Sequence, residues 1–86
     1  MKTSGPLDQL LDLLRDAAGG RYVINEDRKR RIAFFTRGGM QALAAEEKDG
    51  LIRIVYESAP HQVVEELCTP TQGVALIEAI MARTQR

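Results

Sequence analysis

The spacing of apolar residues near the start of the chain predicts an amphipathic helix over residues 6–18. Leucines recur on one helical face, at Leu7, Leu10, Leu11 and Leu14. Aspartates every fourth residue line the other side, as expected for a solvated face. Ser4-Gly5-Pro6 is a typical helix start, and Gly19-Gly20 is a typical stop. The first element is therefore expected to pack its leucine face on the rest of the fold.

A short strand is predicted over residues 21–24, where Tyr22-Val23-Ile24 favours the pleat. Residues 26–36 remain ambiguous. Asn25 can cap a helix there, but six consecutive charged residues, Glu26 to Arg31, would leave only its last turn buried. The other interpretation is a strand over residues 31–36, and local propensity favours it.

Residues 39–49 are expected to form a second helix. Met40, Leu43 and Ala44 make a narrow apolar stripe at helical spacing, and Gly50 follows as a residue that ends helices.

The following residues, 51–68, alternate between apolar and polar side chains and predict a β-hairpin. With a four-residue turn at 58–61, Ile52 faces Leu67 and Tyr56 faces Val63. The same register places Arg53 opposite Glu66 as a cross-strand ion pair.

A last helix is predicted over residues 70–83. Thr69-Pro70-Thr71-Gln72 is a capping box with proline at the first helical position. Apolar residues then form a stripe through Val74, Ile77 and Met81.

The segment from Gly50-Leu51-Ile52 through the hairpin to Thr69-Pro70 and Ala75-Leu76-Ile77-Glu78-Ala79 resembles winged-helix transcription regulators of the MarR and PadR types. The resemblance covers residues 50–79, about a third of the chain. It implies a small α+β domain, winged-helix-like, with a C-terminal β-hairpin as the wing and a capped last helix.

By this resemblance residues 40–49 are the recognition helix and residues 58–61 the wing tip. The implied contacts to double-stranded DNA come from basic residues that grip phosphates, together with one amide on the recognition helix. These residues are Arg28, Lys29, Arg30, Arg31, Arg37 and Gln41. A homodimer through the first and last helices is expected.

An alternative arrangement is a helix followed by two ββα units that share a four-stranded antiparallel sheet. Thr36, Ala42 and Leu43 recur at the spacing of Thr69, Ala75 and Leu76, and each set follows a strand-like run. Residues 22–36 then form a hairpin, and the fold is a binding scaffold rather than a helix-turn-helix.

The distribution of charge bears on whether the chain binds nucleic acid. Twelve basic and twelve acidic residues give no net charge, which is unusual for a domain that depends on phosphate contacts. Charge is nevertheless uneven, because residues 21–37 hold six basic residues against two acidic ones.

No residue set predicts catalysis, a metal site or a cofactor. His61 is the only histidine and lies in a turn, and Cys68 is the only cysteine and is expected to pack rather than react. We therefore expect a protein that is not an enzyme.

Two functional hypotheses remain. The first is a small winged-helix DNA-binding transcription regulator. The second is a protein-binding module acting as a small inhibitor, antitoxin-like partner or adaptor. We expect a cytoplasmic protein without membrane association, because no apolar run reaches spanning length and aspartates interrupt the N-terminal one.

Overall fold

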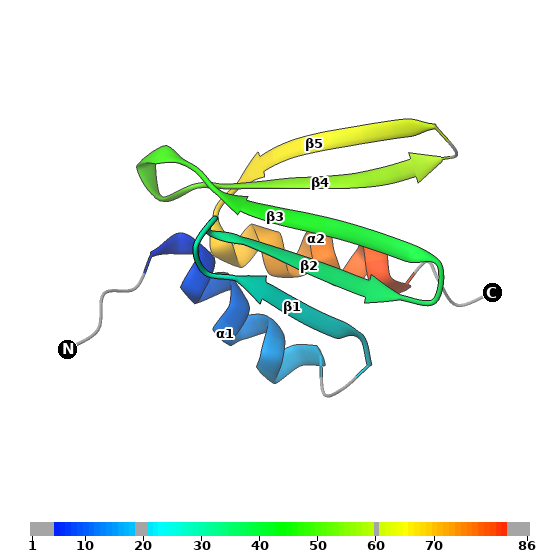
Figure 1. Cartoon of the computed structure of the whole chain (residues 1–86), viewed down its shortest axis with the longest axis horizontal. Coiled ribbons are helices and arrows are strands. Elements are labelled where there is room, and N and C mark those ends of the chain that lie inside the picture. Colours follow the sequence, from blue (N-terminus) through cyan, green and yellow to red (C-terminus); the bar gives the residue numbers. More distant parts are fainter. Residues whose placement is uncertain (1–4, 19–20, 60, 83–86) are drawn as a thin grey trace.

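Helix, five strands and helix follow one another along the chain (Figure 1). The computed structural model describes residues 5–18, 21–59 and 61–82. Helix α1 spans Pro6–Ala18 and helix α2 spans Pro70–Ala82. The strands are β1 (Val23–Asp27), β2 (Ile32–Arg37), β3 (Met40–Glu46), β4 (Ile52–Ala59) and β5 (Gln62–Cys68), with a short turn of 3-10 helix at Lys48–Gly50.

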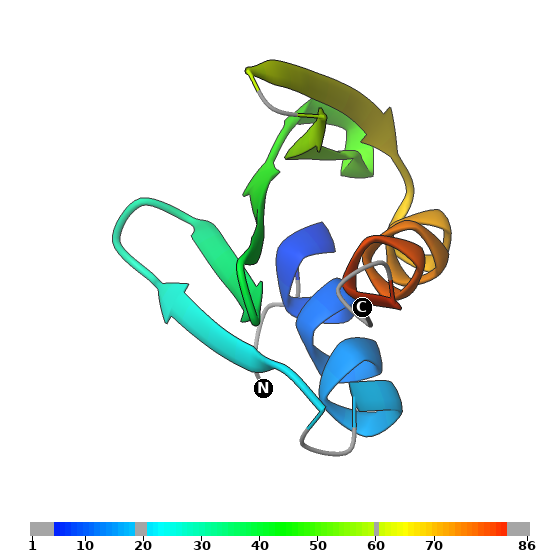
Figure 2. The ribbon, with the colours of Figure 1, turned by 90° about the vertical axis from the view of Figure 1, so that its right-hand side faces the viewer.

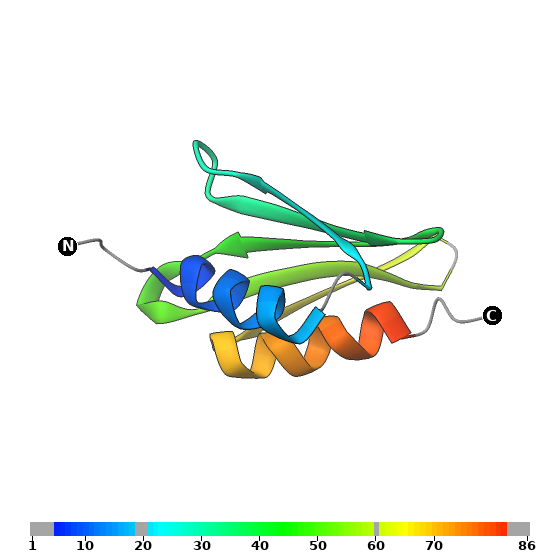
Figure 3. The same ribbon diagram turned by 90° about the horizontal axis from the view of Figure 1, so that it is seen from below.

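The five strands form one antiparallel sheet in the order of the sequence, β1-β2-β3-β4-β5. The sheet curves around α1 and α2, and both helices lie on its concave side (Figures 2 and 3). The helix-bearing side is called the inner face below, and the opposite side is called the outer face. The predicted α+β class is confirmed.

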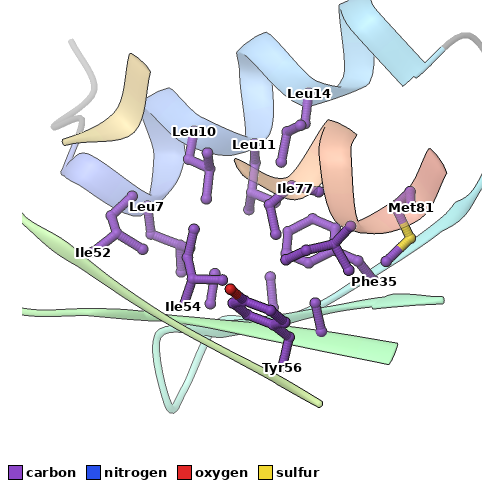
Figure 4. Close-up of a cluster of buried hydrophobic side chains, with 14 of the residues drawn as sticks. Leu7, Leu10, Leu11, Leu14, Phe35, Ile52, Ile54, Tyr56, Ile77 and Met81 are labelled. Carbon is purple, nitrogen blue, oxygen red and sulfur yellow. The ribbon is translucent and has the colours of Figure 1, made fainter. Parts of the chain in front are cut away.

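The core lies between the helices and the inner face (Figure 4). Its largest fully buried side chains are Phe35, Leu7, Leu10, Leu11, Leu14, Ile52, Ile54, Ile77, Ile80 and Met81. Each such side chain contributes about 1.5–3 kcal/mol to folding. The leucine face predicted for residues 6–18 is therefore the α1 side of this core.

Small residues let the layers approach closely. Ala33, Ala42 and Ala44 are buried on the inner face. In α2, a Cβ added to Gly73 would lie 3.0 Å from Leu10 Cδ1 and 3.3 Å from Ile54 Cδ1. The absence of a side chain at Gly73 therefore allows α1, α2 and β4 to pack closely at this point.

Helix α2 begins as its capping box predicts. Thr69 N donates to Gln72 Oε1 at 3.0 Å, and Gln72 N donates back to Thr69 Oγ1 at 3.2 Å. The reciprocal bonds satisfy two amides that the helix itself leaves without partners.

The helix expected at residues 39–49 is wrong, because Met40–Glu46 is strand β3. This strand occupies the centre of the sheet and hydrogen-bonds to β2 and β4 on its two sides. Pairing on both sides and burial of Ala42 and Ala44 outweigh the helix propensity of an alanine-rich segment. Both arrangements considered above placed a helix here, and the sheet has five strands rather than the four of the second arrangement.

Residues 26–36 form neither a continuous helix nor a continuous strand. They comprise the end of β1, a turn and most of β2, so local propensity correctly indicated extended structure near residues 31–36. The strand predicted at 21–24 instead begins at Val23 and continues to Asp27. β1 and β2 form the hairpin of the second arrangement, with Ile24 opposite Phe35.

The hairpin at residues 51–68 is confirmed, but its register differs by one residue. Ile52 pairs with Cys68 and Tyr56 with Val64, whereas Leu67 and Val63 were expected. The pairing of β4 with β5 shifts register between Glu57 and Ala59. Since side chains alternate between faces, this change moves Val63 and Leu67 from the inner to the outer face.

Candidate functional site

The basic residues assigned to DNA contact do not form one surface. Arg28, Lys29 and Arg30 occupy the turn between β1 and β2 and are exposed. Arg37 ends β2, and its Nη1 donates to the Met81 carbonyl at 3.3 Å. Gln41 is exposed on β3. The predicted set is therefore divided between opposite ends of β2.

Arg31 belongs to a charge cluster that joins the sheet to α1. Its Nη2 donates to Asp8 Oδ2 at 3.0 Å and to Glu46 Oε2 at 2.9 Å, and its Nε donates to Glu46 Oε1 at 3.1 Å. We call Asp8, Arg31 and Glu46 the Arg31 cluster. The Arg31 guanidinium is the main cause that holds the pKa of Glu46 below its usual value.

The same cluster completes the N-terminus of α1. Leu7 N donates to Glu46 Oε2 at 3.2 Å, and Gly5 N donates to Asp8 Oδ2 at 3.0 Å. Carboxylates are favourable at a helix N-terminus, where amides point outward without helical partners. Arg31 thus has a structural role that its place in a basic run did not reveal.

Two other arginines of the run lie near carboxylates. Arg28 Nε is 3.7 Å from Glu26 Oε2, and Arg30 Nε is 3.8 Å from Asp27 Oδ2. Both arginines are highly exposed, so these pairs contribute little stability. They nevertheless reduce the positive potential that the run was expected to present.

Neither α1 nor α2 covers the outer face (Figures 2 and 3), and exposed apolar side chains lie on it. Large exposed hydrophobic residues of the described chain number five, and four of them lie on this face. Their exposed fractions are 56% for Val23, 41% for Phe34, 65% for Val63 and 57% for Leu67, while Leu13 on α1 is 45% exposed.

Cross-strand neighbours extend one of these residues, Phe34, into an apolar row. Phe34 pairs with Leu43, and Leu43 pairs in turn with Val55. These pairs form a row across β2, β3 and β4. Leu43 and Val55 are both half-buried. A shallow hollow of about 480 Å³ opens beside the row, and Val63 and Glu57 contribute to its wall. We call Phe34, Leu43, Val55, Val63 and Leu67 the outer apolar patch.

Carboxylates lie both beside and within the outer apolar patch. Glu57 is opposite Val63, Glu65 is opposite Val55 and stands between Val63 and Leu67 on β5, and Asp27 lies at the β1 end. Arg53 is the basic residue of β4 on this face, and it pairs with Glu47 at 2.9 Å and Glu65 at 3.1 Å. The patch therefore has an apolar row across β2, β3 and β4, and on β5 it carries the Glu65 carboxylate between Val63 and Leu67.

Sequence reasoning did not identify this patch. In a strand over residues 31–36, alternation places Ile32 and Phe34 on one face, but it does not indicate which face meets the helices. The predicted register places Val63 and Leu67 opposite Tyr56 and Ile52, whereas the observed register places them on the outer face. The strand β3 that supplies Leu43 was expected to be a helix.

A mixed-charge hollow of about 290 Å³ lies between α1 and the β1–β2 hairpin. It is lined by Asp8, Leu11, Asp12, Arg15, Glu26, Arg28 and Arg31. Arg15 Nη2 donates to Glu26 Oε1 at 3.2 Å, and Arg31 is engaged in its cluster. Opposite charges in this hollow therefore bind one another, which gives it no strong preference for an anion or a cation.

Cys68 and His61 show no arrangement for chemistry. Cys68 is buried, and burial is the main cause that raises the pKa of its thiol, so the reactive thiolate is disfavoured. His61 is exposed in the β4–β5 turn. No group of three potential metal ligands occurs within the described residues.

A buried tyrosine supplies a prediction about alkaline stability. Tyr22 Oη donates to Glu78 Oε2 at 2.7 Å, and burial followed by this carboxylate raises the pKa of Tyr22 well above its usual value. The unfolded chain loses this proton first, at about pH 10, so stability falls as pH rises from there. Tyr22→Phe should remove this part of the loss of stability at alkaline pH. It should also lower the free energy of unfolding at neutral pH by about 0.5–1.5 kcal/mol. Urea unfolding across the alkaline range measures both effects, and an unchanged alkaline slope would contradict the assignment.

Comparisons with known proteins place no relative beside this chain. No protein-family model matches it, and no curated protein or solved structure is significantly similar to it. In the described part of the chain, neither helix has the length and apolar character needed to cross a membrane.

Proposed function

We propose that this chain is a non-enzymatic protein-binding module whose partner covers the outer apolar patch. The observation that carries the proposal is the position of Val63, Leu67 and Phe34, which are exposed on the one face that neither α1 nor α2 covers. Contiguous apolar surface on a small domain marks an interaction site more often than scattered apolar residues do.

Burial of the apolar side chains of the patch would favour the binding of a partner. Each Å² of apolar surface removed from water contributes about 25 cal/mol, and aromatic residues such as Phe34 are enriched among interface anchors. The half-buried Leu43 and Val55 link this phenylalanine to β4 and supply a rigid apolar base. A partner seated here would bury side chains from β2, β3, β4 and β5 together.

DNA binding receives less support from the geometry. The segment assigned to recognition is the central strand β3, which is paired on both sides and cannot enter a major groove as a helix. Arg31 binds Asp8 and Glu46, and Arg37 lies at the opposite end of β2 from the basic turn. A homodimer through the first and last helices remains a prediction, although the apolar stripes of both helices already pack within one copy.

Site-specific photo-crosslinking in cells tests the proposal. Phe34 is replaced by p-benzoylphenylalanine, which keeps an aromatic ring on the outer face. A matched chain carries the same residue in place of Leu13, which is similarly exposed but lies on α1. We expect a discrete protein adduct from position 34 only, which mass spectrometry then identifies.

The identified partner is next purified and titrated against variants of the chain. Val63→Lys combined with Leu67→Lys should abolish binding, because both side chains are mostly exposed and the change places charge within the patch without disturbing the core. Leu13→Ser should bind as the unmodified chain does. Adducts from position 13 alone, or a partner indifferent to the double variant, would refute the proposal, as would salt-sensitive duplex binding that depends on Arg28 and Arg30.

A further inference from the structure

The two edge strands of the sheet differ in how well they are protected against pairing with another strand. β1 is a five-residue edge strand whose second half is charged, and Arg15 and Arg28 approach its Glu26. β5 is a seven-residue edge strand and contains no proline, lysine or arginine. A long edge strand with apolar side chains is a template for pairing with another strand.

The outer side chains of β5 have a simple pattern. Val63, Glu65 and Leu67 follow one another on the outer face, so an acidic residue stands between two exposed apolar ones. The inner side presents Val64 and Glu66 at the intervening positions. Val63 also lines the hollow of the outer apolar patch, which makes the edge and the patch continuous.

These charges disfavour a second copy of the chain as the occupant. The antiparallel register that pairs all seven residues of β5 with another β5 places Glu65 opposite its own counterpart. Like charges directly opposite each other destabilise a strand pair. Glu65 Oε1 accepts from Arg53 Nη1 at 3.1 Å, but 57% of the Glu65 side chain is exposed, so a basic residue of an added strand can share this carboxylate and make the contact favourable.

We propose that the partner binds by adding a strand to the β5 edge, through a segment that alternates apolar, any residue, basic, any residue, apolar. Its apolar residues lie beside Val63 and Leu67, and its Lys or Arg lies beside Glu65. This inference rests on the proposed protein-binding function and specifies its binding mode and partner chemistry. Backbone hydrogen bonds supply affinity in strand addition, while alternate side chains supply specificity.

The pattern of the partner does not depend on strand direction. Val63, Glu65 and Leu67 read as apolar, acidic, apolar in both directions, so a parallel and an antiparallel segment meet the same chemistry. Glu66 adds a second carboxylate on the inner side of the edge, where Tyr56 Oη donates to its Oε2 at 2.9 Å. A basic residue at an adjacent position of the partner would gain from it as well.

The test uses the whole chain and a displayed library of random peptides. Selection on the immobilised chain should enrich the apolar-x-basic-x-apolar pattern, and the strongest binder is then synthesised in three forms. The first is unmodified, the second has Glu in place of each Lys or Arg, and the third has alternate backbone amides N-methylated with the side chains unchanged. Affinity is measured by fluorescence anisotropy.

The charge-reversed peptide should bind at least about tenfold more weakly, because each reversed pair changes a favourable contact into a repulsive one. The N-methylated peptide should lose binding by at least the same factor, since it cannot pair with a strand edge. A chain carrying Glu65→Lys should prefer the charge-reversed peptide, and Leu13→Ser should behave as the unmodified chain.

Failure of the binding mode is distinct from failure of the function. If N-methylation leaves affinity unchanged while Val63→Lys removes it, the peptide docks on the face without strand pairing, and the strand-addition inference is overturned although protein binding stands. Enrichment of acidic or patternless peptides also overturns it. An absence of any adduct at position 34 instead removes the proposed function itself.

Discussion

Replacing Phe35 by alanine is expected to lower the free energy of unfolding by about 3–5 kcal/mol. Phe35 is fully buried on the inner face of β2 and packs in the core beneath both helices (Figure 4). Its truncation removes apolar contact with both layers and leaves a cavity that the close approach of the helices prevents from collapsing. Urea-induced unfolding monitored by circular dichroism measures the loss.

The neighbouring Phe34 gives a control of the same residue type on the same strand. It faces outward and is partly exposed, so Phe34→Ala should change stability by less than about 1 kcal/mol. The same variant should weaken partner binding, whereas a conservative Phe35→Leu should not. Equal destabilisation by the two alanine variants would contradict the assignment of faces.

Replacing Arg31 by methionine is expected to lower the free energy of unfolding by about 1–2 kcal/mol at neutral pH. The change leaves the Asp8 and Glu46 carboxylates together at the start of α1 without the guanidinium that binds both. The side chains of the Arg31 cluster are partly exposed, so water moderates the loss relative to a fully buried pair. Chemical denaturation at neutral pH provides the measurement.

The pH dependence of stability gives a second, independent test of the role of Arg31. Because Arg31 lowers the pKa of Glu46 in the folded state, the associated stability is present above the unfolded pKa of about 4.3 and disappears as pH falls through the lower folded value. The difference between the native chain and Arg31→Met should therefore shrink in acid. Arg28→Met is the control from the same basic run, since its exposed side chain should contribute less than about 0.5 kcal/mol.

This pair of variants also separates structural from nucleic-acid roles within the run. If Arg31 served DNA contact alone, its replacement would leave the unfolding curve unchanged. A fall in stability at Arg31 with none at Arg28 instead shows that adjacent members of one charged run have different environments. The basic run indicates local charge, whereas the role of each arginine depends on the groups that it contacts.

Local sequence predicted several elements well because their signals are local. The leucine spacing of residues 6–18, the capping box at Thr69 and the alternation of residues 51–68 each depend on neighbours within about one helical turn or one hairpin. The helix at 39–49 failed for the opposite reason. Its alanines and glutamates favour a helix locally, but the segment gains hydrogen bonds on both sides and burial only as the central strand.

The sequence by itself determined the α+β class, both helices and the hairpin of residues 51–68. Only the tertiary structure decided the strand at Met40–Glu46, the engagement of Arg31 and the register of β5. The last of these has the largest consequence for function, because side chains in a strand alternate and a one-residue shift exchanges the two faces. The observed register buries Cys68 and packs Val64 against the core, and it places Val63 and Leu67 outside, where a partner can reach them.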